Sequence, residues 1–433
     1  MHRMIRINGK EYEIDADDRQ SILQIINQLP VSFHSNCEYG KCGSCGAIIN
    51  GKPNLMCKEL VGNRQEIKLE PLTIFPHIRD LLVDFNFDLL RQDALPKFDF
   101  DYKEMQQLRR CIECFLCLEV CPAFKSFRDK IPISMILNKQ LVRKSISQSI
   151  QSHLFNCTSC NSCSEVCPQE IEIFEKVVRR LRGLAPIEAH PSHLKLRKRV
   201  EKTGRSMSKE IDDTLLGKKF EVEKPIDNLI LFLGCFGTLK KRFQELNRRY
   251  IEFLNQLGYS VIIPREQICC GSPLSKIGFE DLFQKLVDWN SQVFFVHQRL
   301  YDAEIITSLC PGCVSALKSQ YHLKEIRNFA DFLEEEIEIP KGTYYHQPCH
   351  DESRLAEKFN LKENVLCCGA GGGSRSFDPE VSRQIGSLAV DRLSEGERVM
   401  TTCPFCITQL ETMLSIPVFH PLERFNKKER YIN

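Results

Sequence analysis

Cysteine is the residue type on which the chemistry of this chain depends. The chain has 22 cysteines among 433 residues, and every one belongs to a group whose spacing suits a set of metal ligands. Four lie near the N-terminus, eight form two matched runs, and ten form a repeated pattern in the C-terminal half. Disulfide-rich proteins are usually small and secreted, so metal-binding thiolates are the better interpretation for a chain of this length. The pattern predicts several iron–sulfur clusters and a reducing compartment, the cytoplasm.

The first group has the spacing C-x4-C-x2-C-x11-C, and its first three cysteines match the plant-type ferredoxin loop that binds a [2Fe-2S] cluster. The predicted ligands are Cys37, Cys42, Cys45 and Cys57. Three glycines of the loop, Gly40, Gly43 and Gly46, allow close approach of the backbone to the cluster. Four thiolates also suit a structural zinc ion, but the four-residue gap and the glycines favour the ferredoxin loop.

Two later runs, CIECFLCLEVCP and CTSCNSCSEVCP, both follow C-x2-C-x2-C-x3-C-P. In bacterial proteins with this pattern the runs bind two [4Fe-4S] clusters, and the fourth cysteine of each run binds the other cluster. One predicted ligand set is therefore Cys111, Cys114, Cys117 and Cys167. The other predicted ligand set is Cys157, Cys160, Cys163 and Cys121. Zinc fits these runs poorly because the repeated motif matches a defined cluster fold.

The ten C-terminal cysteines form two copies of one pattern. The first copy consists of Cys235, Cys269, Cys270, Cys310 and Cys313. The second copy consists of Cys349, Cys367, Cys368, Cys403 and Cys406. The Cys-Cys-Gly pairs are 98 residues apart and the Cys-Pro-x-Cys motifs 93 residues apart, which indicates a duplicated supersecondary unit. The copies differ in the gap before the pair, which is 33 residues in the first and 17 in the second.

The segments around these cysteines predict the elements that position them. Before the first group the sequence indicates a strand, a turn at Asn8 and Gly9, a second strand and a helix over 21–29, and after it strands over 47–49 and 67–69. That order predicts a β-grasp domain. In the C-terminal half, the apolar runs at 229–236 and 258–264 flank a helical stretch, which indicates α/β layering.

Composition excludes several classes of function. A net charge of +2 with 27% charged residues predicts no strong field toward nucleic acid or anionic lipid. The basic run over 194–202 is interpreted as a solvated helix face within a polar, Lys-rich segment. No apolar stretch approaches the roughly 20 residues of a spanning helix, and the first residues lack the features of a signal peptide. We therefore expect a soluble chain with no transmembrane segment.

The first 190 residues resemble the iron–sulfur subunits of succinate dehydrogenase and fumarate reductase, in the x11 gap to Cys57, the segment 76–85 and the order of the two cluster regions. Many members of that family lack a cysteine at the position of Cys160 and hold a three-iron cluster. Its presence here implies a four-iron cluster.

The C-terminal repeat resembles the CCG domain of heterodisulfide reductase catalytic subunits. The resemblance implies that each five-cysteine set binds a noncubane [4Fe-4S] cluster, with the first set, Cys235 to Cys313, as the catalytic one. The shorter gap of the second copy leaves open whether its cluster site is altered or empty. His346 and His350, on either side of Cys349, are by default structural, with a ligand or proton-carrier role as the alternative. The segment GAGGGS at 369–374 has no phosphate-loop signature and is interpreted as close approach of backbone to a cluster.

The whole arrangement resembles the iron–sulfur subunits of the thiol:fumarate reductase family of methanogens. The resemblance implies oxidation of coenzyme M and coenzyme B thiols to the heterodisulfide in the CCG half, and electron transfer through the clusters to FAD on a flavoprotein partner that reduces fumarate. In agreement, the chain has no dinucleotide fingerprint of its own. Two alternatives remain open. One is an iron–sulfur subunit of a quinone-linked succinate, glycolate or lactate dehydrogenase, and the other is a subunit that only relays electrons. The direction of electron flow, the electron donor and the oligomeric state stay undetermined.

The predicted fold class is therefore multidomain α+β. We expect a [2Fe-2S] β-grasp domain over 1–75, a helical domain with two [4Fe-4S] clusters over 76–190, a linker over 191–225 with some helix, and a duplicated α/β CCG domain over 226–433 with repeats at 226–340 and 341–433. The expected cofactors are one [2Fe-2S] cluster, two cubane [4Fe-4S] clusters and one or two noncubane [4Fe-4S] clusters.

Overall fold

The computed structural model describes residues 2–85, 102–126, 154–183, 189–207, 214–238, 241–333 and 339–424, which include all 22 cysteines. The chain divides into two compact units. The N-terminal unit comprises Met1–Cys157 and Asn161–Arg182, and the C-terminal unit comprises Thr158–Cys160 and Gly183–Asn433. Among the described helices, none combines the length and the apolar character that crossing a bilayer requires.

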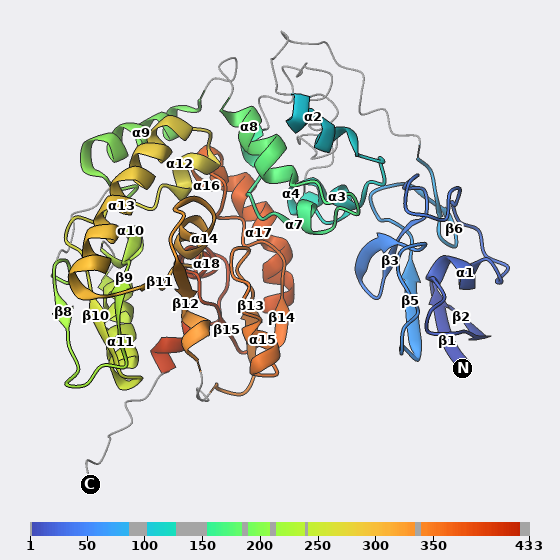
Figure 1. The fold of residues 1–433 in the computed structure, drawn as a ribbon. Helices are drawn as coiled ribbons and strands as arrows, with labels where there is room; N and C mark the ends of the chain where they lie inside the picture. The colour runs from blue at the N-terminus through green and yellow to red at the C-terminus, as the bar shows by residue number, and fades with distance from the viewer. Residues whose placement is uncertain are drawn as a thin grey trace. The chain divides into compact units, whose positions relative to one another are not determined.

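The N-terminal unit begins with a five-stranded mixed sheet in the order β2-β1-β5-β3-β4 (Figure 1). Its strands are β1 His2–Ile7, β2 Lys10–Asp15, β3 Gly46–Ile49, β4 Lys52–Leu55 and β5 Glu66–Glu70. Strand β1 runs antiparallel to β2 and parallel to β5, which is the β-grasp arrangement that the sequence predicts. Helix α1, Ile22–Ile26, begins at a capping box in which Ser21 and Gln24 satisfy each other's backbone N–H groups, within the predicted helix range.

A small hairpin and a helical region complete this unit. The elements are β6 His77–Arg79, β7 Leu82–Val83, α2 Tyr102–Arg109, α3 Leu116–Glu119, α4 Pro122–Ser126, η1 Leu154–Asn156, α7 Ser162–Glu165, η2 Phe174–Val178 and α8 Arg179–Arg182. The two matched cysteine runs fold alike. Glu113 and Phe115 have φ of +55° and +64°, and the corresponding Ser159 and Asn161 have φ of +56° and +67°. Residues other than glycine rarely have a positive φ, so the repetition of these values shows that the two loops have the same backbone conformation.

The C-terminal unit contains two sheets whose strands are parallel except at one edge, and helices alternate with the strands along the chain, as the predicted α/β layering requires (Figure 1). The first sheet has the order β12-β11-β9-β10-β8, with β8 Lys219–Phe220, β9 Asp227–Leu231, β10 Tyr259–Ile262, β11 Ile305–Ser308 and β12 Glu325–Asn328. The second has the order β14-β13-β15-β16, with β13 Thr343–His346, β14 Lys362–Asn364, β15 Arg398–Met400 and β16 Val418–Phe419. Four strands of the first sheet therefore have counterparts in the second, and antiparallel β8 is added at one edge.

Apart from one short helix of the first copy, the described helices connect these strands in the same order in both copies. In the first copy they are α10 Gly234–Gly237, α11 Lys241–Gln256, α12 Ser272–Lys276, α13 Glu280–Tyr301, α14 Pro311–Gln320 and η3 Phe329–Phe332. In the second they are α15 Leu355–Lys358, α16 Ser374–Phe377, α17 Pro379–Leu393, α18 Pro404–Leu410 and η4 Pro421–Arg424. The 16-residue helix α11 is replaced by the four-residue helix α15. The shorter gap of the second copy thus shortens a crossover helix between two strands and leaves the cysteine-bearing turns in place.

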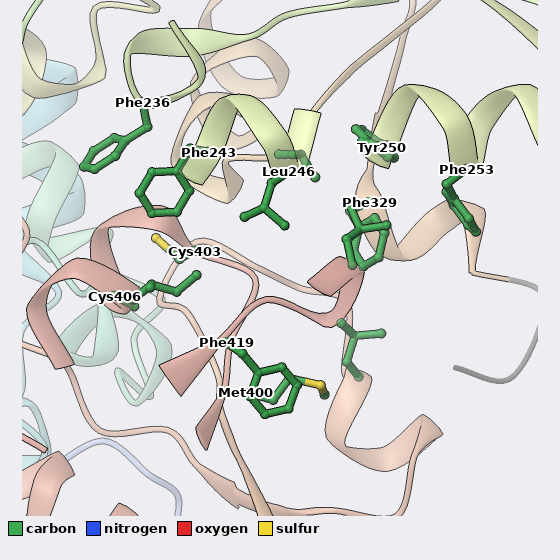
Figure 2. Packing of buried hydrophobic residues seen from close by; sticks show 14 of the residues in the cluster. Phe236, Phe243, Leu246, Tyr250, Phe253, Phe329, Met400, Cys403, Cys406 and Phe419 are labelled. Atoms are coloured by element: carbon green, nitrogen blue, oxygen red, sulfur yellow. The ribbon is translucent and has the colours of Figure 1, made fainter. Parts of the chain in front are cut away.

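One continuous hydrophobic core joins the two copies. Figure 2 shows Phe236 and Phe243 of the first copy in the same cluster as Cys403, Cys406 and other residues of the second. The rings of Phe236 and Phe405 lie 4.4 Å apart at an angle of 69°. Since the core is shared, the two copies fold as one body and hold their cysteines in a fixed relation.

The segment that the sequence indicates as a linker is part of the C-terminal unit. Its predicted helical content is present as α9, Pro191–Thr203, which begins at His190 and ends at Gly204 in the left-handed conformation. The imidazole of buried His193 contacts the carbonyl of Gly373 at 3.0 Å, which fastens α9 to the second copy. Residues 208–213 of the predicted linker lie outside the described residues.

Candidate metal centres and a cysteine-lined cavity

The four cysteines of the first group lie near one another: Cys42 interacts with Cys37, and Cys45 with Cys57 and Cys42. Backbone N–H groups of Tyr39 and Lys41 donate to the sulfur of Cys37 at 3.5 and 3.2 Å. The Ser44 hydroxyl lies 3.0 Å from the sulfur of Cys42. Burial raises the pKa of Cys45 to about 12, and contact with Cys57 contributes. The loop therefore supplies the donor set that a [2Fe-2S] cluster requires.

Cys167 of the second run lies beside the first run, as the crossed pattern predicts. Burial raises the pKa of the Cys114 thiol to about 12, and the nearby Cys167 and Cys111 contribute. A small cavity is lined by the four cysteines of this predicted set, Cys111, Cys114, Cys117 and Cys167, with apolar Ile112 and Phe115 beside them. Four thiols around one apolar cavity fit a [4Fe-4S] cluster.

The loop that follows Cys157 belongs to the C-terminal unit. There the hydroxyl oxygen of Thr158 accepts a hydrogen bond from the sulfur of Cys367 at 3.2 Å. Cys160 lies near enough to Cys349 to raise the pKa of that thiol, although contact with Cys367 is the larger cause. The second cysteine set of the C-terminal half therefore lies directly against the Thr158–Cys160 loop, a proximity that the spacing of the cysteines did not predict. The complete set Cys157, Cys160, Cys163 and Cys121 stays a prediction.

The first C-terminal set forms a continuous chain of thiols at the carboxyl ends of parallel strands. Cys235 follows β9, and Cys310 follows β11 and begins helix α14. The sulfurs of Cys270 and Cys313 lie 3.5 Å apart. Hydrogen bonds from Cys269 and Cys313 lower the pKa of Cys270 to about 5. All five thiols of this set are buried, and their number and proximity fit a multi-iron cluster.

The second set repeats this arrangement. Cys349 follows β13, and Cys403 follows β15 and begins α18. The sulfurs of Cys368 and Cys406 lie 3.4 Å apart. Hydrogen bonding with Cys367 and Cys406 holds the pKa of Cys368 well below its ordinary value, as at the corresponding Cys270. The shortened crossover helix has therefore not dispersed this set.

The glycine after each cysteine pair has a positional role. Gly271 and Gly369 have φ of +80° and +83°, and their N–H groups donate to Cys269 and Cys367 sulfurs at 3.4 and 3.3 Å. A Cβ atom on Gly271 would lie 2.4 Å from the ring of Phe283, and one on Gly369 would lie 2.1 Å from the carbonyl oxygen of Ser382. Only glycine meets both the steric and the conformational demand of this turn.

Both cysteine sets line a single cavity of about 640 Å³. Its lining includes all ten cysteines together with Lys195, Arg199, Lys276 and Arg375, and no carboxylate occurs among the residues that line it in the described part of the chain. The first two of these cations lie on α9, so the basic run is only in part a solvated face. A cavity with thiol ligands and cationic side chains is suited to a small anionic substrate with a reactive sulfur atom.

Lys276 and His350 meet between the two cysteine sets. The ammonium of Lys276 contacts Nε2 of His350. Burial lowers the pKa of Lys276, while Cys349, Cys270 and Cys403 are among the nearby thiols that oppose this shift. Burial and the neighbouring Lys276 lower the pKa of His350, so the imidazole is the neutral partner. The sequence singled out His350 but gave no signal for Lys276, because the contact joins residues 74 positions apart.

His346, the other histidine near Cys349, faces the second set. One of its ring nitrogens and the sulfurs of Cys368 and Cys406 all lie within 4.8 Å of one another. The side chain has no exposed surface, and burial lowers its pKa to about 4, so the imidazole is neutral. A direct interaction with the second cysteine set is therefore geometrically available, beyond the structural role that is the default for a buried histidine.

The glycine-rich segment after Gly369 allows close packing of protein backbone. A Cβ atom on Gly371 would lie 2.3 Å from the carbonyl oxygen of Thr158, and one on Gly373 would lie 2.4 Å from Ile277. Residues 370–373 also line the cavity. The predicted approach to a cluster stays a prediction, and the approach that the structure describes is to the Thr158 loop and the end of α12.

Three family models match the chain in the predicted order. A 2Fe-2S iron-sulfur cluster binding domain matches residues 5–87, a 4Fe-4S dicluster domain matches residues 107–171, and a cysteine-rich domain matches residues 229–318 and 352–411. The last match falls on both copies of the C-terminal repeat. These matches confirm the predicted fold class.

Curated relatives resemble the chain over most of its length. An uncharacterized iron-sulfur protein of Methanococcus maripaludis is 32% identical over 89% of this chain and 87% of its own. One subunit of the fumarate reductase (CoM/CoB) of Methanothermobacter marburgensis is 26% identical over 94% of this chain and 91% of its own. One subunit of the dihydromethanophenazine:CoB–CoM heterodisulfide reductase of Methanosarcina barkeri is 25% identical over 70% of this chain and 88% of its own.

Proposed function

Because the chain belongs to the family of fused iron–sulfur proteins that includes this fumarate reductase (CoM/CoB) polypeptide, we propose that it is the iron–sulfur subunit of a fumarate reductase driven by thiol oxidation. Coenzyme M and coenzyme B are the thiol substrates. Two thiols yield one disulfide, two protons and two electrons. A flavoprotein partner with FAD uses two electrons and two protons to reduce fumarate to succinate.

The observation that carries this proposal is the single cavity lined by both five-cysteine sets. Two thiols that must become one disulfide have to lie side by side, and one cavity that reaches both sets can bring the two thiols together. The cations of the lining and the absence of carboxylates among the described lining residues support substrates that carry negative charge. Lys276, between the sets, favours the thiolate form of a bound substrate.

We propose that both C-terminal sets hold a noncubane [4Fe-4S] cluster, with the twelve N-terminal cysteines as ligands of one [2Fe-2S] and two [4Fe-4S] clusters in the predicted sets. The equal arrangement of thiols in the two copies supports a filled second site. When bound, such clusters bind thiolate sulfur at iron and accept electrons one at a time. The chain itself supplies the ligands, the buried cation and a cavity with a mostly apolar surround.

The proposal is tested by separating the two halves of the reaction. In the purified complex, Cys270→Ala is expected to abolish fumarate reduction by thiols and to leave fumarate reduction by reduced viologen intact, because the dye supplies electrons beyond the damaged set. Ser319→Ala, an exposed change on α14, is the control and should affect neither activity. Loss of both activities in folded, flavoprotein-bound protein would contradict the proposal. An unchanged thiol-dependent rate would contradict it too, and would favour an electron-relay or quinone-linked role.

A further inference from the structure

The duplication allows the two cysteine sets to be compared position by position. In the first sheet Leu229 pairs with Ile305, and in the second sheet Thr343 pairs with Arg398. Leu229 and Thr343 each lie six residues before the first cysteine of their set. Phe232 and His346 therefore occupy the same position, three residues before that cysteine. Both side chains are completely buried. The second set thus has an imidazole where the first has an apolar ring.

The orientation of the His346 ring is determined by Asn364, its pairing partner on β14. The backbone N–H of Leu366 donates to Oδ1 of Asn364 at 3.2 Å. The amide nitrogen of Asn364 consequently faces Nδ1 of His346, at 3.3 Å. An amide nitrogen can only donate, so Nδ1 accepts this hydrogen bond and the ring proton of the neutral imidazole lies on Nε2.

One ring nitrogen of His346 and the sulfurs of Cys368 and Cys406 all lie within 4.8 Å of one another. Because Nδ1 is paired with Asn364, Nε2 is the nitrogen left to interact with these sulfurs. It is buried and has no hydrogen-bond partner among the described residues. A histidine that ligates iron through Nε2 needs a free electron pair there and a proton on Nδ1, which the amide of Asn364 opposes. The geometry is that of a donor to thiolate sulfur and not that of a metal ligand.

We propose that His346 donates its Nε2–H to the thiolate sulfurs of the second set and thereby raises the reduction potential of the cluster held there. This inference rests on the proposed filling of that set. A hydrogen bond to sulfur stabilises the more negative, reduced form of a cluster. The first set has no donor at the corresponding Phe232, although the cation Arg205 lies near Cys235 and Cys269.

The test is an anaerobic redox titration of the full-length protein, followed by EPR. His346→Phe, which copies the residue of the first set, should lower the potential of the second cluster while iron content and the other potentials are unchanged. Asn364→Asp replaces the amide donor by an acceptor, moves the ring proton to Nδ1, and should lower the same potential without removing the imidazole. Phe232→Leu is the matched control in the first copy and should leave the second cluster unaffected.

Three results would overturn the inference. The first is a second cluster whose reduction potential is unchanged in both His346→Phe and Asn364→Asp while the iron content is full. That result would contradict the role of His346 but not the proposed cluster assignment. The second is a strong ¹⁴N coupling in the wild type by pulsed EPR, which would make His346 a ligand. The third is a wild-type chain with no cluster in the second set by iron analysis, which would overturn the proposed cluster assignment together with this inference.

Discussion

Gly43 and Cys114 are in direct contact between the two cluster-binding regions of the N-terminal unit. A Cβ atom on Gly43 would lie 2.8 Å from both Cα and Cβ of Cys114. The buried carboxylate of Glu119 fastens the same regions together, since it accepts hydrogen bonds from the backbone and hydroxyl of Thr73 at 2.8 and 2.6 Å. The loops of the predicted [2Fe-2S] cluster and of the first [4Fe-4S] cluster therefore meet with no side chain between them.

Gly43→Ala should slow electron transfer between these two clusters, because the added methyl group has to push the loops apart. Stopped-flow spectroscopy of the [2Fe-2S] absorbance after reduction measures this rate. Gly51→Ala is the control: Gly43 and Gly51 have φ of +75° and +81°, but a Cβ on Gly51 meets nothing within 4 Å. Both variants should lose about 1–2 kcal/mol of stability from the left-handed backbone. Equal transfer rates in the two variants would show that the contact is not part of the electron path.

Anaerobically purified protein should contain about 18 iron atoms per chain, from one two-iron and four four-iron clusters. From the sequence alone, the length difference between the copies leaves open an altered or an empty second site, and an empty site would give a count of about 14. Because that difference falls in a crossover helix, we expect the higher value. Iron and acid-labile sulfide analysis decides the matter, and a count near 10 would refute clusters in both C-terminal sets.

Cys160→Ile should convert the second cubane cluster into a three-iron cluster, since one of four predicted ligands is removed and an apolar side chain replaces it. The oxidised protein would then show the EPR signal of a three-iron cluster. Cys160→Ser is the matched variant, because its hydroxyl retains a weak ligand atom and should preserve part of the four-iron form. Unchanged four-iron spectra in Cys160→Ile would refute the crossed ligand assignment for this site.

The sequence predicted what depends on local spacing. The C-x2-C-x2-C runs indicated two similar loops, and the structure gives both the same left-handed residues. The Cys-Cys-Gly pairs predicted a repeated unit, and the two sheets have matching strand order and register. In each case neighbouring residues define a turn or a strand, and the turn places the thiols.

Contacts between distant residues could not be predicted in this way. Two such contacts are those of Lys276 with His350 and of Thr158 with Cys367. Both depend on how whole helices and strands pack, and the spacing of residues along the chain does not indicate that packing. Helix α9 was assigned to a linker because its surface residues are polar, although Lys195 and Arg199 line the cavity. The polar sequence of α9 correctly predicted that many of its side chains are exposed. It gave no information about the cavity that Lys195 and Arg199 line.

Gly369→Ala should lower the stability of the protein and the iron content of the second cysteine set more than an alanine substitution at a glycine with open space around it. The left-handed backbone costs about 1–2 kcal/mol, and the clash with the carbonyl of Ser382 adds about 1–3 kcal/mol. Gly258→Ala is the matched control, because its φ is +94° but the nearest contact of an added Cβ is 3.4 Å. Thermal unfolding and iron content measure both effects. Equal stability and iron content in the two variants would show that the close approach at Gly369 is not needed.

Lys276→Met should raise KM for the thiol substrates at least about tenfold, since removing a charge from a buried site typically costs about 2 kcal/mol or more and roughly 1.4 kcal/mol is tenfold. The variant should keep its clusters, because no cysteine is altered, and fumarate reduction by reduced viologen should be unchanged. Lys276→Arg retains the charge and should recover part of the affinity. Lys285→Met, an exposed change on α13, controls for the loss of one positive charge from the protein. If Lys276→Met and Lys285→Met have the same KM, the cation between the two cysteine sets does not bind the substrate, and thiol recognition must depend on the remaining cavity cations Lys195, Arg199 and Arg375.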